Sequence, residues 1–276
     1  MTISVDQTTG ASPATTPANP SVGQFVWADL MTKDQDAALR YYAAVTGWTV
    51  TFWDMGPTKY AMWTVPGRGP DATIGGVMQM PPDDPNGAHW MLHLSVSDCA
   101  ARTAQAASLG ATVLVPPQEV PTVGQFAVIR DPQGAVVSLF TPLQPMPKGM
   151  PAVGEFSWFE LGTTDRAAAV AFYSALVGWE AGALHDMGGG MLYQEVQRPG
   201  DHWPTAGIYT ILPSMPMTPA WTPYVRVADV EAAAARMTAH GGQLFNGPME
   251  VPGGDRVAFG TDAEGALFAV HQMAAG

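Results

Sequence analysis

The first part of the chain switches between strand-like and helix-like spacing of its apolar positions. The run Phe25–Leu30 predicts a strand, and Thr32 or Asp34 is suited to cap a following helix. Apolar residues then recur on one helical face until Gly47, a typical helix-ending residue. Proline and glycine separate three further strand-like runs, which complete a βαβββ unit: Trp48–Asp54, Lys59–Val65 and Thr73–Met80.

The same order of elements then restarts. Trp90–Val96 predicts a strand, and Asp98 is suited to cap an alanine-rich helix that runs to Leu109 and stops at Gly110. Three more strands are predicted near Thr112–Val115, Gln125–Arg130 and Ala135–Thr141. The first half of the chain therefore predicts two βαβββ units.

The second half repeats the first at an offset of 131 residues. The segment Gly23-Gln-Phe-Val-Trp-Ala-Asp-Leu aligns with Gly154-Glu-Phe-Ser-Trp-Phe-Glu-Leu, and at the same offset Asp131 aligns with Asp262. An offset kept over so long a stretch indicates a duplicated domain. The predicted fold class is α+β, with four βαβββ units forming two tandem domains.

The repeat also sets the expected domain bounds. We expect a disordered tail over residues 1–20, a first domain over 21–141, a linker over 142–151 and a second domain over 152–276. The tail is rich in threonine, proline and alanine, and it lacks the basic start and apolar core of a secretory signal. A cytoplasmic location is therefore expected.

Composition narrows the classes of partner. The 276 residues include 12 Lys and Arg against 24 Asp and Glu, a net charge of −12, which argues against a nucleic-acid partner. No apolar stretch approaches the roughly 20 residues that span a bilayer, so no membrane partner is expected. The single cysteine, Cys99, excludes an intramolecular disulfide and a cysteine-based zinc site. A monomer or a homodimer in free solution is expected.

Several short motifs together resemble one known family. The Asp-capped helix with a Tyr-Tyr pair and a Gly-Trp end, the turn Arg130-Asp-Pro-Gln-Gly134 and the segment Ile74-Gly-Gly-Val resemble the vicinal oxygen chelate superfamily. That superfamily includes glyoxalases, extradiol dioxygenases and bleomycin resistance proteins. The resemblance covers residues from about 22 to 272, and it implies that paired βαβββ units roll their sheets into glyoxalase-like cups.

The resemblance also implies where metal ligands would lie. Metal-binding members take ligands from the first and last strands of each unit, and the corresponding positions here are Trp27, roughly Gly76, Met91 and Ser138, and then Trp158, roughly Gly207, Thr222 and Ala269. Divalent ions of this class prefer imidazole and carboxylate ligands. Indole and methyl groups offer no lone pair, so we expect no metal and no other cofactor.

Residues two positions further along the same strands are expected to face the same cups. These are Asp29, His93 and Phe140 in the first domain, and Glu160, Tyr224, Arg226 and His271 in the second. One hypothesis is that Glu160 orients His271 as a general base while Tyr224 donates a hydrogen bond to a ligand carbonyl. The alternative is that Glu160 pairs with Arg226 and His271 only ends a strand. Asp29 and His93 could form a pair similar to the catalytic one.

Two tryptophans complete the prediction of function. Trp27 and Trp158 would give each cup a flat apolar wall suited to a planar ligand. The expected ligand-binding residues are Trp27, Asp29, Met91, His93, Ser138, Phe140, Trp158, Thr222, Arg226 and Ala269.

We therefore predict a metal-independent binding protein for a planar, aromatic small molecule, including cationic antibiotic-like ones. Its role would be self-resistance or an accessory step in natural-product biosynthesis. The alternative function is a lyase, isomerase or hydroxylase that acts on a small carbonyl compound with Glu160, His271 and Tyr224 as acid/base groups.

Overall fold

The computed structural model describes residues 20–54, 59–69, 72–146, 149–215 and 217–274, so the predicted tail lies almost wholly outside the described residues. The first half contains β1(Phe25–Thr32), α1(Gln35–Thr46), β2(Thr49–Asp54), β3(Lys59–Thr64), β4(Thr73–Gln79), β5(His89–Ser95), α2(Cys99–Ser108), β6(Thr112–Val120), β7(Gly124–Arg130) and β8(Val136–Pro142). The second half contains β9(Phe156–Thr163), α3(Arg166–Val177), β10(Glu180–Asp186), β11(Leu192–Gln197), β12(Ala206–Thr210), β13(Ala220–Arg226), α4(Val230–Ala239), β14(Gln243–Glu250), β15(Arg256–Thr261) and β16(Leu267–Gln272). The predicted four βαβββ units are confirmed.

Each half forms one eight-stranded mixed sheet with the same strand order. The orders are β2-β3-β4-β1-β5-β8-β7-β6 and β10-β11-β12-β9-β13-β16-β15-β14. The first strands of the two units in each half pair antiparallel, β1 with β5 and β9 with β13. The α+β fold with tandem domains is therefore confirmed, and the central strands β4, β1, β5 and β8 carry the predicted site positions of the first domain.

The sequence specifies the helices through their ends. At the start of each helix in the described ranges, the side chain of an aspartate accepts a hydrogen bond from the third following backbone N–H, as Asp34 does from Ala37 at 2.9 Å. Gly47 and Gly178 end α1 and α3 with φ of 79°, a left-handed conformation that favours glycine. Among the described helices, none is long and apolar enough to cross a membrane.

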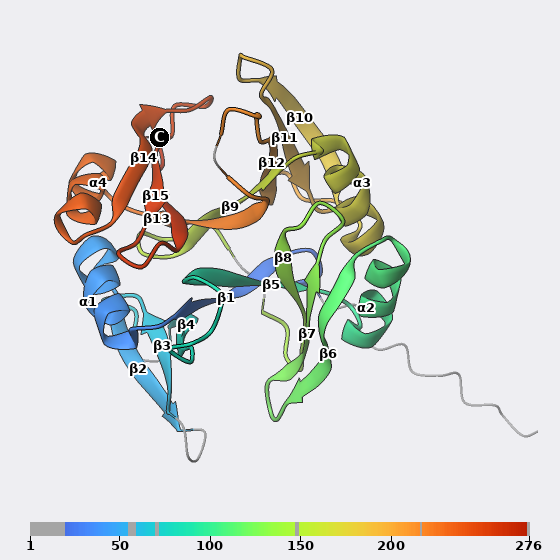
Figure 1. The fold of residues 1–276 in the computed structure, drawn as a ribbon, viewed down its shortest axis with the longest axis horizontal. Coiled ribbons are helices and arrows are strands. Elements are labelled where there is room, and N and C mark those ends of the chain that lie inside the picture. The colour runs from blue at the N-terminus through green and yellow to red at the C-terminus, as the bar shows by residue number, and fades with distance from the viewer. Residues whose placement is uncertain (1–19, 55–58, 70–71, 147–148, 216, 275–276) are drawn as a thin grey trace, which may run out of the picture.

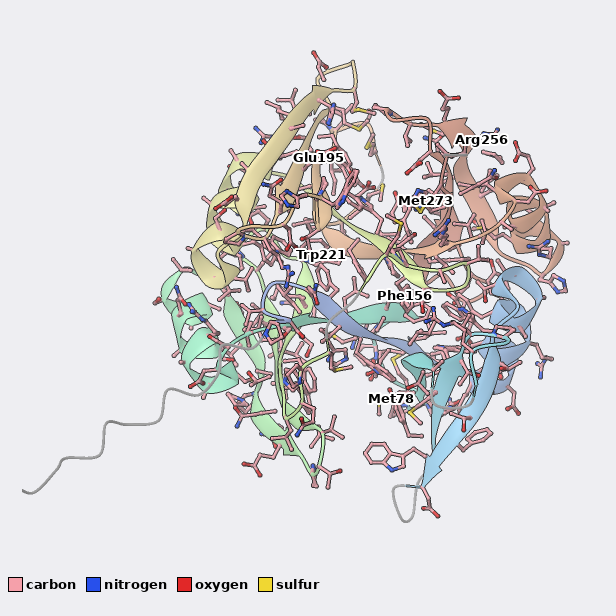
Figure 2. The ribbon with its side chains drawn as sticks, turned by 180° about the vertical axis from the view of Figure 1, so that it is seen from behind. Met78, Phe156, Glu195, Trp221, Arg256 and Met273 are labelled. Atoms are coloured by element: carbon pink, nitrogen blue, oxygen red, sulfur yellow. The ribbon has the colours of Figure 1, made fainter. Side chains whose placement is uncertain are left out.

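The two sheets curve away from a shared boundary, and helices pair across it (Figure 1). Helix α1 contacts α4, and α2 contacts α3. Aromatic rings fill the boundary, where Phe25 lies 4.5 Å from Phe159 and 4.9 Å from Trp221 between ring centroids. Figure 2 shows Phe156 and Trp221 between the sheets. The two domains thus share one hydrophobic core.

Reciprocal hydrogen bonds join the domains. The Tyr42 hydroxyl donates to Asp262 in the second domain at 3.1 Å, and Tyr173 donates to Asp131 in the first domain at 3.1 Å. The indoles of Trp48 and Trp179, both fully buried, donate to backbone carbonyls of the opposite domain at 2.7 and 2.8 Å. Desolvation raises the pKa of both aspartates above its usual value, and it raises the pKa of both tyrosines well above theirs. The boundary is therefore pseudo-symmetric.

Candidate functional site

We call the inner face of the first sheet around Trp27 and Asp29 cup 1, and that of the second sheet around Trp158 and Glu160 cup 2. In cup 1 the Trp27 indole donates to the Tyr60 hydroxyl at 2.8 Å and to Asp29 Oδ1 at 3.1 Å. Tyr60 itself donates to Asp29 Oδ1, and His93 Nε2 lies 3.0 Å from Asp29 Oδ2. Asp29 is therefore a buried carboxylate with three side-chain partners, one of them an imidazole.

The strand register explains why Asp29 meets His93. Asp29 lies opposite Met91 and Trp27 lies opposite His93, so Asp29 and His93 are diagonal neighbours on adjacent antiparallel strands. Diagonal neighbours on one sheet face are within reach of long side chains. The two residues that the sequence analysis considered as a pair do lie together.

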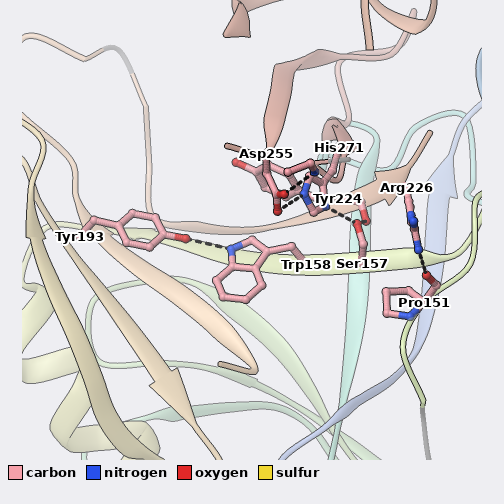
Figure 3. A network of polar contacts seen from close by, with 9 residues as sticks. Pro151, Ser157, Trp158, Tyr193, Tyr224, Arg226, Asp255 and His271 are labelled. Atoms are coloured by element: carbon pink, nitrogen blue, oxygen red, sulfur yellow. Dashed lines mark hydrogen bonds and ion pairs between the residues drawn. The ribbon is translucent and has the colours of Figure 1, made fainter. Parts of the chain in front are cut away.

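Cup 2 repeats the aromatic part of this arrangement. The Trp158 indole donates to the Tyr193 hydroxyl at 2.8 Å, as Figure 3 shows. Tyr224 donates to Glu160 Oε1 at 2.8 Å, and Tyr193 also hydrogen-bonds to Glu160. Desolvation raises the pKa of Glu160 to about 7, although the two phenol hydrogen bonds act in the opposite direction. Glu160 and Tyr224, which were expected to face the same cup, thus contact each other directly, whereas the sequence analysis expected Tyr224 to donate to a ligand.

A glycine makes room for the tyrosine in each cup. A Cβ atom on Gly76 would lie 1.9 Å from the Tyr60 hydroxyl, and one on Gly207 would lie 1.8 Å from the Tyr193 hydroxyl. Such distances are far inside van der Waals contact, so each tyrosine crosses the strand where the side chain is missing. These glycines are the approximate ligand positions that the family resemblance implies on β4 and β12.

The prediction that Glu160 orients His271 is wrong. His271 Nδ1 lies 2.8 Å from Ser157 Oγ, and Nε2 lies 2.9 Å from Asp255 Oδ2 (Figure 3). Glu160 is level with Thr222, whereas His271 is level with Arg226, four residues further along β13. Four strand residues span about 13 Å, too far for a contact.

Arg226 does not pair with Glu160 either. Its guanidinium donates to the carbonyl of Pro151, the last residue of the expected linker. His271 is more than the end of a strand, because it is buried and holds partners through both ring nitrogens. Neither hypothesis from the sequence therefore describes the surroundings of His271.

The remaining predicted residues lie around or beneath the cups. Met91 is half-buried, and Phe140 is buried with its ring centroid 6.0 Å from that of His93. Ser138, Thr222 and Ala269 are buried. The Ser138 hydroxyl oxygen has no hydrogen-bond partner within the described residues.

The donor set at the implied metal positions does not suit a divalent ion. The two indole N–H groups are hydrogen-bond donors, and both are already bonded to tyrosines. Within residues 20–274, the described part contains no group of three or more His, Cys, Asp or Glu side chains arranged to hold a metal. Thioether, hydroxyl and methyl groups are poor replacements for imidazole and carboxylate.

Four site residues escaped the sequence analysis, namely Tyr60, Tyr193, Ser157 and Asp255. The tyrosines are 133 residues apart, whereas the repeat offset is 131, so the alignment of the halves did not pair them. Ser157 sits where the β13–β9 register shifts, and a bulge there re-aims a side chain. The signal that could have found the tyrosines is a strand tyrosine in the first unit of each domain, next to a glycine-bearing strand.

Comparisons with known proteins agree with this architecture. The family model described as a glyoxalase-like domain matches residues 25–140. The model described as the glyoxalase/bleomycin resistance protein/dioxygenase superfamily matches residues 155–270.

Similar proteins and structures match over most of the chain. A Mycobacterium tuberculosis protein named "Putative glyoxylase CFP32" is 30% identical over 256 residues, which are 90% of this chain and 94% of that protein. A Streptomyces protein named "Anthracycline biosynthesis protein DauV" is 28% identical, over 91% of this chain and 94% of that protein. A Mn(II)-bound glyoxalase from Novosphingobium aromaticivorans has a TM-score of 0.64 at 18% identity, over 91% of this chain and 82% of that one. At that identity the structural likeness concerns the fold alone.

Proposed function

The chain is a tandem member of the glyoxalase/bleomycin resistance protein/dioxygenase superfamily, and from this premise we propose that it binds a planar aromatic small molecule without a metal ion. The observation that carries the proposal is the locked indole in each cup. Trp27 and Trp158 occupy positions where the family resemblance implies metal ligands, and each indole is fixed by a 2.8 Å bond to a tyrosine. A fixed, flat apolar wall favours stacking on a planar ligand, because little side-chain entropy is lost on binding.

The polar groups beside each wall would set the orientation of the ligand. In both cups a carboxyl and a tyrosine hydroxyl lie next to the indole, and they can exchange hydrogen bonds with phenol or quinone oxygens. A relative named for anthracycline biosynthesis is consistent with a polycyclic aromatic ligand. We propose an accessory step in natural-product biosynthesis as the role, with self-resistance as the other role of a protein that sequesters such a compound.

Tryptophan fluorescence and calorimetry test the proposal with 2-(hydroxymethyl)anthraquinone as the probe. We expect quenching and saturable heat for the unmodified chain. Trp27→Leu together with Trp158→Leu should weaken binding at least tenfold, which corresponds to about 1.4 kcal/mol. Trp203→Leu is the control, because Trp203 is 74% exposed. Unchanged affinity in the double variant would overturn the proposal.

A second candidate function is proton transfer in cup 2. The observation that favours it is the near-neutral pKa of Glu160 beside the Tyr224 hydroxyl, a combination that suits a general base and an enolate-stabilising donor. Glu160 would take a proton from the carbon next to a carbonyl, which is the first step of a lyase or isomerase reaction. His271, held by Asp255, would be a separate acid/base group at the other end of the cup.

Deuterium exchange tests this second candidate. Methylglyoxal and pyruvate, incubated with the protein in D2O, would lose protons next to the carbonyl at a rate that NMR follows. Glu160→Gln should abolish the exchange, and His271→Ala should abolish net turnover while binding persists. Exchange that is equal in the unmodified chain and in Glu160→Gln would remove the assignment.

A further inference from the structure

The two cups differ in the side chain that they place against their carboxyl group. Asp29 in cup 1 has an imidazole partner, His93, at 3.0 Å. The residue of cup 2 that aligns with His93 is Tyr224, which gives Glu160 a neutral phenol instead. We propose that cup 2 selects ligands that carry a protonated amine, and that Glu160 is the counter-ion of that amine. This inference rests on the proposed function, because it names the class of ligand that one cup prefers.

Arg226 and His271, the basic side chains that the sequence analysis places in cup 2, have other partners. Arg226 donates to the Pro151 carbonyl, and His271 lies between Asp255 and Ser157. The groups that act on Glu160 are phenols from three neighbouring strands, Tyr193, Tyr209 and Tyr224. Within the described ranges, Glu160 forms no ion pair with a lysine, arginine or histidine.

An uncompensated carboxylate in a desolvated site attracts a cationic guest. Desolvation disfavours the ionised form of Glu160, and an ammonium group at hydrogen-bond distance would reverse that effect. Charge-assisted hydrogen bonds are about twice as strong as neutral ones. In cup 1 the same gain is not available, since His93 already occupies that side of Asp29.

The walls around Glu160 suit the same guest. Trp158 and the three tyrosines lie on β9, β11, β12 and β13, which are adjacent in the sheet. Aromatic faces attract ammonium groups, and tryptophan and tyrosine are the most effective of them. The net charge of −12 adds a general attraction for cations at low ionic strength.

Calorimetry with three matched planar probes tests the inference at pH 7.5. The probes are 2-(aminomethyl)anthraquinone, 2-(hydroxymethyl)anthraquinone and anthraquinone-2-carboxylate, which share one ring system and differ in charge. We expect the amine to bind the unmodified chain at least tenfold more tightly than the alcohol, and the carboxylate to bind most weakly.

The variants assign that preference to Glu160. Glu160→Gln keeps the shape of the side chain and should reduce the amine-to-alcohol ratio of affinities to about one. Tyr224→His supplies the imidazole that cup 1 has and should reduce the ratio in the same way, whereas His93→Tyr should create a second amine-preferring site. Glu180→Gln is the matched control, because Glu180 is an exposed glutamate of the same domain.

The outcomes separate the two proposals. Equal affinities for amine and alcohol in the unmodified chain would overturn the inference and leave the proposed function standing. A preference that persists in Glu160→Gln would also overturn it. If none of the probes binds, the proposed function fails and this inference fails with it.

Discussion

Cup 1 and cup 2 share a frame of indole, tyrosine and glycine, but they treat their carboxyl groups differently. Trp27 and Trp158 each donate to a tyrosine hydroxyl at 2.8 Å, and each tyrosine crosses a glycine that has no room for a Cβ atom. The carboxyl partner is an imidazole in cup 1 and phenols in cup 2. The members of the frame interlock, so a change in one disturbs the others, whereas the partners of the carboxyl groups can be exchanged one at a time.

The second imidazole reinforces the contrast. Cup 2 places His271 between Ser157 and Asp255, and the aligned residues of cup 1 are Phe140, Val26 and Gly124. A Cβ on Gly124 would lie 2.9 Å from the Phe140 ring, so the phenylalanine fills the space where cup 2 has a carboxylate. The pair of His93 and Asp29 in cup 1 and the pair of His271 and Asp255 in cup 2 thus lie on different strands.

The domain boundary is the part of the molecule that stayed symmetric, and breaking it should have the largest effect. Asp262→Ala removes the acceptor of Tyr42 and of two backbone N–H groups, and Asp131→Ala removes the acceptor of Tyr173 and of three. We expect each change to lower the free energy of unfolding by about 3 kcal/mol. Urea denaturation measures both, and losses that differ by more than about 2 kcal/mol would contradict the symmetry.

The shared frame gives the next largest effect. Gly76→Ala and Gly207→Ala should each displace the tyrosine that crosses the glycine, and overpacking of this kind costs about 1–3 kcal/mol. Each change should also weaken binding of 2-(hydroxymethyl)anthraquinone in its own cup. Gly87→Ala is the control, because a Cβ there meets no atom within 4 Å. Thermal melts measure the loss of stability, and calorimetry measures the loss of binding. If both variants match the unmodified chain in both measurements, the glycine–tyrosine contact does not support the cups.

The Glu160 carboxyl predicts a smaller effect that depends on pH. Its folded pKa of about 7 lies above the ordinary 4.5, so the unfolded chain ionises first as the pH rises. The free energy of unfolding should therefore fall between about pH 4.5 and pH 7 and then level off, by roughly 3 kcal/mol at most.

Glu160→Gln should remove this fall, because the amide does not ionise. Urea denaturation of both proteins at pH 4.5, 6 and 8 makes the comparison. Parallel pH profiles for the two proteins would show that the pKa of Glu160 is not raised.

The smallest effect is expected at the pair that only cup 2 has. Asp255 is one-third exposed on its side chain, and its contact with His271 is that of a partly solvated hydrogen-bonded pair. Asp255→Asn should therefore lower stability by less than about 1 kcal/mol. A loss above about 2 kcal/mol in a urea melt would mean that the pair supports the whole second sheet.

The fold followed from the sequence because its signals are local and repeated. Aspartate caps such as Asp34 and the helix-ending Gly47 each act within one unit. The offset of 131 residues shows that the same signals occur a second time, which supports their interpretation in the first half. Strand register is less local, and it decides which side chains meet. Alternation alone correctly assigned Asp29 and His93 to one face, and their diagonal register then brought them into contact.

The same reasoning failed for His271 for a physical reason. Glu160 and His271 lie on β9 and β16, two strands that β13 separates, and their levels along the sheet differ by four residues. The partner that replaced Glu160 is Asp255, which precedes β15 and carries no periodic signal. The sequence could predict which residues line a cup, but not which end of the cup each one occupies.

The most direct test of the account is calorimetry of the unmodified protein with 2-(hydroxymethyl)anthraquinone before and after removal of divalent ions with EDTA. The account predicts the same affinity in both samples and no further change when Mn²⁺ is returned, since indoles and phenols form the site. Binding that disappears with EDTA and returns with stoichiometric Mn²⁺ would contradict it.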